Sequence, residues 1–213
     1  MSQRDAAQLL GRLFAAYRGF SSYEDDGTVS MGDRHRPLRG DTTFRTLFLR
    51  PSYFRFEFAS PHPYEPLAHI VTTTICGCDG ISPYMWQKHH DSPPRLEICE
   101  SLELAIAGAT GISSGSAYTI SQLLMPKPDG SLAALEELSV AESESVDGVT
   151  CNVISGKLLR ASAETHLFVD PETSILRRVD SRFDRFSSQE VRRHIKVNAE
   201  IEVSRFRMPS GEI

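Results

Sequence analysis

The chain has 213 residues, a formal net charge of −5 and a hydrophobic fraction of 40%. This length suits one β-rich domain, and a chain of this composition can bury a core and need not be disordered. The acidic balance lacks the global basic footprint of a nucleic-acid-binding protein, and no apolar run approaches the ~18 residues of a transmembrane segment.

Residues 3–20 are predicted to form a helix, because apolar residues recur there at helical spacing. The apolar stripe consists of Leu9, Leu10, Leu13, Phe14 and Tyr17. Arg12 interrupts the segment, which therefore lacks the continuous apolar core of a signal peptide. We expect either a cytoplasmic protein or a mature chain whose export signal has been removed.

After this helix the hydrophobic period changes to 2, which indicates strands. In "SYFRFEFAS", Phe54, Phe56 and Phe58 lie on one face, so this strand requires a large apolar partner. The segment 190–206 also alternates and is predicted as one long strand. Further aromatic residues in predicted strands are Phe44, Phe48, Tyr84, Trp86 and Phe168.

A helical insert at about 95–125 interrupts the strands, with helical patches at about 95–108 and 116–125. The order shows no regular βαβ alternation, which argues against a parallel doubly wound sheet. Short turns between consecutive strands favour an antiparallel meander. We predict a single α+β domain, 1–213, in which helices cover the concave face of a strongly curved antiparallel sheet.

Between the two helical patches, "GISSG" fits G-x-S-x-G, the nucleophile elbow of serine hydrolases. An elbow needs a strand before its turn, whereas "ESLELAIAGAT" has helical spacing. Ser113, Asp170 and His194 could be ordered as a triad, but Asp170 begins the turn "DPETS" and His194 lies on the polar face of a strand. We predict no catalytic residue. The segment is instead a candidate hinge or lid joint formed by Gly111, Ser113, Ser114 and Gly115, with Ser113 or Ser114 capping the next helix.

The four cysteines permit two disulfides without requiring them. Cys76 and Cys78 have strand spacing and share a face, and His89 and His90 follow across a predicted hairpin. These residue types suit zinc, but the spacing is no established zinc pattern, and adjacent histidines on a strand point to opposite faces. We predict no metal and no cofactor, and we favour plain packing for the thiols.

The eight aromatic residues named above are candidates for the lining of an apolar ligand cavity. A curved sheet can leave such a concave space beneath its helices. Ordinary core packing is the competing explanation for each residue.

Several segments, in this order, resemble the LolA/LolB-like superfamily and, within it, outer-membrane lipoprotein-sorting proteins. They are the N-terminal helix running into "AYRGFSSYEDDGTV", then "TTFRTLFLRPSYFRFEF", "DGISPYMW", "HLFVDPETSILRRVD" and "FRMPSG". The resemblance implies a half-open β-barrel whose helices act as a lid over bound acyl chains or another apolar ligand.

The same resemblance implies a non-enzymatic lipid or lipoprotein carrier-like protein of the bacterial periplasm or cell envelope. Its partners would be lipid or lipoprotein acyl chains and a membrane-anchored protein. A sensor or interaction domain of the envelope, without a filled cavity, is the alternative. A serine or metal-dependent hydrolase is the least favoured reading, because the strand before the serine motif and an established metal-ligand spacing are both missing.

Overall fold

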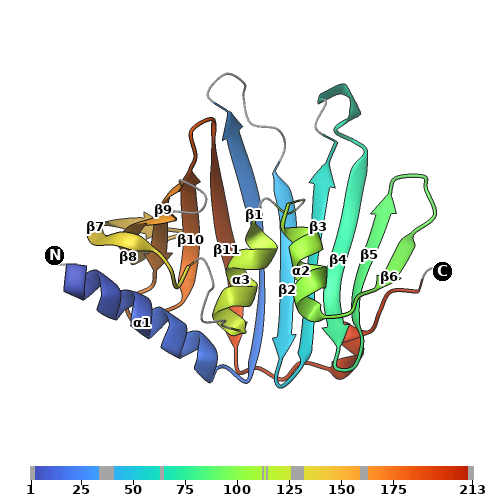
Figure 1. The fold of residues 1–213 in the computed structure, drawn as a ribbon, viewed down its shortest axis with the longest axis horizontal. Coiled ribbons are helices and arrows are strands. Elements are labelled where there is room, and N and C mark those ends of the chain that lie inside the picture. The colour runs from blue at the N-terminus through green and yellow to red at the C-terminus, as the bar shows by residue number, and fades with distance from the viewer. Residues whose placement is uncertain are drawn as a thin grey trace. The chain divides into compact units, whose positions relative to one another are not determined.

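A computed structural model describes residues 3–33, 41–62, 65–111, 113, 115–125, 132–158 and 163–210. Across these residues it contains three α-helices and eleven strands, which makes the fold α+β (Figure 1). The α-helices are α1 (Gln3–Gly19), α2 (Leu102–Thr110) and α3 (Ser116–Leu124), and two short 3-10 helices are η1 (Glu65–Leu67) and η3 (Val203–Phe206).

The strands form one antiparallel sheet in the order β6-β5-β4-β3-β2-β1-β11-β10-β9-β8-β7. Over the described ranges the end strands β6 and β7 do not pair with each other, so the sheet is open. The predicted class, an open antiparallel sheet with helices, is confirmed. The strands are β1 (Ser22–Asp33), β2 (Thr42–Leu49), β3 (Tyr53–Pro61), β4 (Val71–Asp79), β5 (Pro83–His89), β6 (Arg95–Ile98), β7 (Glu136–Val146), β8 (Val149–Leu158), β9 (Ala163–Val169), β10 (Leu176–Arg182) and β11 (Phe186–Val197).

The chain groups into two compact units, which are described separately below. The first unit comprises Met1–Phe20, Met31–Pro37 and Thr119–Arg192. The second unit comprises Ser21–Ser30, Leu38–Tyr118 and Arg193–Ile213. The single domain predicted from the sequence stays a prediction.

In the first unit, helix α1 packs on β7 and β8. It ends at Gly19, one residue before the predicted boundary. The Tyr17 hydroxyl oxygen accepts a hydrogen bond from the Leu176 backbone N–H at 3.3 Å. Spacings of three and four residues place the apolar side chains on one side of a helix, which explains the buried set: Ala6, Leu9, Leu10, Leu13 and Tyr17.

In the second unit, helix α2 packs on β4 and β5. The helix begins at Leu102, because the Ser101 hydroxyl caps it by accepting a hydrogen bond from Leu104 N at 3.2 Å. The predicted start of the helical insert, about residue 95, is wrong. Arg95–Ile98 forms strand β6, whose residues pair with β5 from Gln87 to Tyr84.

The predicted strand 190–206 ends at Val197 instead of continuing. Asn198 has a φ of 55°, a left-handed conformation that asparagine tolerates better than most residues. Its side-chain oxygen accepts a hydrogen bond from Ser21 N at 2.8 Å. The chain then turns away from the strand direction and forms η3, because Ile201 and Phe206 bury against Leu47 of the second unit.

Candidate functional site

Five phenylalanines form a continuous buried layer on one face of the second unit. Phe44 lies opposite Phe58, and Phe48 lies opposite Phe54, in the β2–β3 register. Their side chains are 0–4% exposed, and the Phe56 ring lies 5.5 Å from the Phe44 ring and 5.9 Å from the Phe58 ring. We call Phe44, Phe48, Phe54, Phe56 and Phe58 the aromatic layer.

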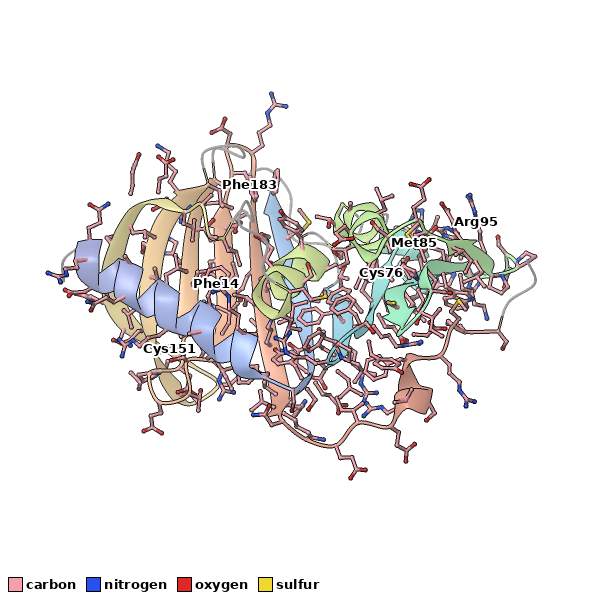
Figure 2. All side chains as sticks on the ribbon, turned by 60° about the horizontal axis from the view of Figure 1, so that its bottom comes forward. Phe14, Cys76, Met85, Arg95, Cys151 and Phe183 are labelled. Carbon is pink, nitrogen blue, oxygen red and sulfur yellow. The ribbon has the colours of Figure 1, made fainter. Side chains whose placement is uncertain are left out.

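The aromatic layer lies on the face of the sheet that α2 covers. Phe56 is opposite Cys76 on β4, and Cys76 is opposite Met85 on β5, so all three share a face. A Cβ added at Gly108 of α2 would lie 3.3 Å from the Met85 sulfur. Figure 2 labels Cys76 and Met85 next to α2. Helix α2 therefore packs over β4 and β5 on the same apolar face that the aromatic layer continues across β3 and β2.

Tyr84 and Trp86, two of the predicted cavity residues, lie on the opposite face. Their partners in the β4–β5 register are Gly77 and Ile75, which alternate with the residues of the α2-covered face. The Tyr84 hydroxyl donates a hydrogen bond to the Phe206 carbonyl at 3.2 Å. The register therefore separates both residues from the aromatic layer, and their predicted role as cavity residues stays a prediction.

Phe168 lies in the first unit, in a separate apolar cluster. The Arg178 guanidinium carbon sits 3.6 Å from the centre of its ring, a cation–π contact. The remaining members of that cluster are Val146, Cys151, Val153 and Val191. Of the eight predicted residues, the structure therefore brings together the five of the aromatic layer.

The chain after β11 covers the other face of the second unit. Phe206 is fully buried, and its ring centre lies 5.4 Å from that of Tyr53. Glu24 fastens this segment by accepting hydrogen bonds from Arg205 at 2.6 and 3.1 Å and from Arg45 at 2.5 Å. The hydrogen bond from Arg205, together with that from Arg45, lowers the pKa of Glu24 to about 2.

The residues of the possible hydrolase triad each have a local structural role. The residues before Gly111 form helix α2, so the strand that a nucleophile elbow needs is replaced by a helix. The Asp170 carboxylate accepts hydrogen bonds from the N–H groups of its own turn and from Arg177 at 3.0 Å. The His194 ring lies 2.9 Å from Asp26.

In the candidate hinge between α2 and α3, the described residues form several hydrogen bonds. Ser113 is fully buried, and its hydroxyl oxygen accepts a hydrogen bond from Ala117 N at 3.3 Å, the predicted capping of α3. Gly115 has a φ of +94°, which favours glycine. Gly111 has helical dihedral angles. Ser114 lies outside the described residues, and a hinge role for this segment stays a prediction.

The cysteines and histidines considered for zinc are separated by the strand register. His89 pairs with Thr72, four residues along β4 from Cys76, which corresponds to about 13 Å. Burial raises the pKa of the Cys76 thiol to about 12. Within the described ranges, no group of three or more His, Cys, Asp or Glu side chains is placed to hold a metal ion. No helix in the described part of the chain is long and apolar enough to cross a membrane.

Comparison with known proteins shows that this fold is similar to that of a solved structure. No family model matches the sequence. No curated protein matches it either. Among solved structures, LprF from Mycobacterium bovis matches with 13% identity and a TM-score of 0.61, covering 98% of each chain.

Two further matches among solved structures have lower TM-scores. The lipoprotein LppX of Mycobacterium tuberculosis is 15% identical, with 95% of this chain and 100% of that chain covered and a TM-score of 0.49. A LolA superfamily protein from Nitrosomonas europaea is 8% identical, with 95% and 97% covered and a TM-score of 0.39. The match to LprF, together with the open antiparallel sheet and its helices, shows that the chain shares the fold of that protein.

Proposed function

We propose that the protein reversibly binds an apolar ligand, such as a lipid acyl chain, between helix α2 and the aromatic layer. The observation that carries the proposal is the composition of this interface. One wall is the aromatic layer, and the other is the buried side of α2, formed by Ala105, Ile106 and Ala109. Ligand sites are typically lined by apolar and aromatic side chains of this kind.

Binding at this interface requires α2 to move. Protein atoms already cover the aromatic layer, since its members are at most 4% exposed. Helix α2 has only nine residues, and its exposed surface includes Leu104, which is 54% exposed. A short helix depends on tertiary packing for its stability, so an acyl chain that replaces its apolar contacts can offset the cost of displacement.

The fold supports the same proposal. The resemblance to the LolA/LolB-like superfamily implies helices that close over an apolar space holding acyl chains. It also implies the periplasm or cell envelope as the compartment, with a lipoprotein or a membrane-anchored protein giving or receiving the ligand. We include this compartment and this kind of partner in the proposal.

The tight cover over the aromatic layer also favours a second function, an envelope sensor or interaction domain. In that case the phenylalanines are a permanent core, and α2 never leaves them. The two functions differ in one measurable property, because only the first needs an exchangeable ligand.

The test is displacement of a fluorescent C18 fatty acid, supported by native mass spectrometry of the purified protein. Ala109→Leu adds bulk on the buried side of α2, and Ala107→Leu adds the same bulk on its exposed side. We expect Ala109→Leu to weaken fatty-acid binding about tenfold or more, since it fills the space the ligand needs. Ala107→Leu should bind like the wild type.

Circular dichroism and thermal melting would verify that both variants are folded before binding is compared. Equal affinities for the two variants would place the ligand elsewhere. Absence of any bound lipid and of any displacement in the wild type would favour the sensor or interaction domain.

A further inference from the structure

Two hydroxyl groups on the α2-covered face are fully buried and form no hydrogen bond with any residue that the structure describes. Thr46 on β2 and Thr74 on β4 are both 0% exposed. Neither Oγ1 atom has a hydrogen-bond partner among the described residues. Buried hydroxyls are nearly always satisfied, so two unsatisfied ones in one surface call for an explanation.

The strand register places both threonines within the surface that contains the aromatic layer. Thr46 lies between Phe44 and Phe48 on β2 and is opposite Phe56. Thr74 is opposite Phe58. Side chains on one face of a sheet alternate with those on the other, so both hydroxyls belong to the face that α2 covers.

The polar residues opposite the two threonines do not satisfy their hydroxyls. Asp25 is the register partner of Thr46 on β1, and its carboxylate accepts a hydrogen bond from the Tyr23 hydroxyl at 2.6 Å. Thr74 is paired across β4–β5 with Gln87, yet its Oγ1 makes no hydrogen bond with a described residue. Both hydroxyls therefore keep their hydrogen-bonding capacity although a polar residue lies opposite each of them.

We propose that Thr46 and Thr74 donate hydrogen bonds to carbonyl oxygens of the bound ligand and so make the site selective for acyl esters over plain hydrocarbons. This inference rests on the proposed ligand site beneath α2. A hydroxyl left unsatisfied in the empty protein gains a partner on binding, and a site with such groups discriminates against ligands that cannot pair with them.

The separation of the two hydroxyls sets the geometry of recognition. They are two strands apart and offset by two residues, which corresponds to roughly 12 Å between them. One carbonyl cannot reach both positions. Each threonine therefore serves its own carbonyl, and single substitutions should act separately.

The experiment compares methyl palmitate with octadecane as competitors of the fluorescent fatty acid, both delivered as cyclodextrin complexes. We expect the wild type to bind the ester about tenfold more tightly than the alkane. The single carbonyl of methyl palmitate can pair with only one threonine at a time. Thr46→Val and Thr74→Val, which keep the side-chain shape, should therefore each lower ester affinity by about half and leave alkane affinity unchanged. The double variant should bind the two competitors equally.

A stability measurement tests the premise without any ligand. Thr165 of the first unit is also fully buried, but its hydroxyl lies 3.4 Å from the Ser181 hydroxyl. Urea denaturation should show that Thr165→Val lowers the free energy of unfolding. Thr46→Val and Thr74→Val should leave it unchanged or raise it, because no hydrogen bond is lost.

The outcomes separate this inference from the function on which it rests. If neither competitor displaces the probe from the wild type, the ligand site itself is wrong and the inference falls with it. If both competitors displace it equally and the valine variants change nothing, only the role of the threonines is wrong. Destabilisation by Thr46→Val and Thr74→Val as large as that by Thr165→Val would show that the hydroxyls have partners in the empty protein.

Discussion

Glu24 is predicted to make the second unit more stable at neutral than at acid pH. Its carboxylate, whose side chain is 13% exposed, binds Arg205 of η3 and Arg45 of β2. Replacing it by glutamine removes the charge while nearly preserving size. The variant should therefore lose the ion pairs with Arg205 and Arg45. These ion pairs hold η3 against the face of the sheet that contains Tyr53.

The magnitude follows from the lowered pKa. The pKa of Glu24 falls from 4.5 to about 2, which corresponds to at most about 3.5 kcal/mol of stability at ~1.4 kcal/mol per tenfold change in proton affinity. Arg45 is 55% exposed, so solvent screening reduces the expected value to about 1–2 kcal/mol.

Stability should fall as the pH is lowered, because the pKa of the Glu24 carboxylate is lower in the folded than in the unfolded protein. The contribution is fully present above the unfolded pKa of 4.5 and is lost as the pH falls through the folded value of about 2. Urea denaturation of the wild type and Glu24→Gln should therefore show a constant difference in unfolding free energy near neutral pH. At about pH 3 the difference should be roughly halved, because the unfolded carboxylate is then largely protonated.

Glu164→Gln is the matched control, since Glu164 is 58% exposed and lies 3.5 Å from His166. We expect it to change the free energy of unfolding by less than ~0.5 kcal/mol. A Glu24→Gln difference that does not depend on pH would show that the effect comes from packing instead of charge. Equal unfolding free energies for the wild type and Glu24→Gln would refute a stabilising role for these ion pairs.

Three further predictions concern stability in the second unit, each measured by urea denaturation. Gly77→Ala should cost more than ~2 kcal/mol, because the added Cβ would lie 2.6 Å from the Phe54 carbonyl oxygen. Gly11→Ala is its control, since the new Cβ meets nothing within 4 Å and stability should rise slightly. Phe56→Ala should cost about 3–5 kcal/mol, as expected for a fully buried aromatic residue, and a smaller loss would show that the layer is loosely packed. Ser113→Ala should cost about 1 kcal/mol through loss of the α3 cap and leave any ester turnover unchanged, whereas loss of turnover would revive the hydrolase reading.

Local hydrophobic periodicity was sufficient to predict the elements whose apolar residues recur at one regular spacing throughout. Helix α1 follows from apolar residues three and four positions apart, and the shared face of Phe54, Phe56 and Phe58 follows from alternation along β3. The helix before Gly111 was also predictable, because Ala-rich helical spacing outweighs a five-residue motif. In each case the information lies within a few neighbouring residues.

Which candidate site residues share a face could not be predicted where this depended on strand register. Tyr84 and Trp86 are aromatic residues on a strand next to β4, but only the β4–β5 pairing shows that they lie opposite the aromatic layer. A shift of one residue would exchange the two faces of β5. Thr46 and Thr74 carried no signal for the same reason, since a threonine in a strand is ordinary until its burial and missing partner are known.

The amino-acid sequence by itself determined the class of the fold, the amphipathic helix at the start, the aromatic strand and the absence of a nucleophile elbow. Tertiary structure decided the end of β11, where burial of Ile201 and Phe206 overrides an alternation that would otherwise continue. It also decided the pairing of Glu24 with Arg205, 181 residues away. Periodicity is a property of neighbours along the chain, whereas a face, a cap or an ion pair between distant segments exists only once the strands have paired.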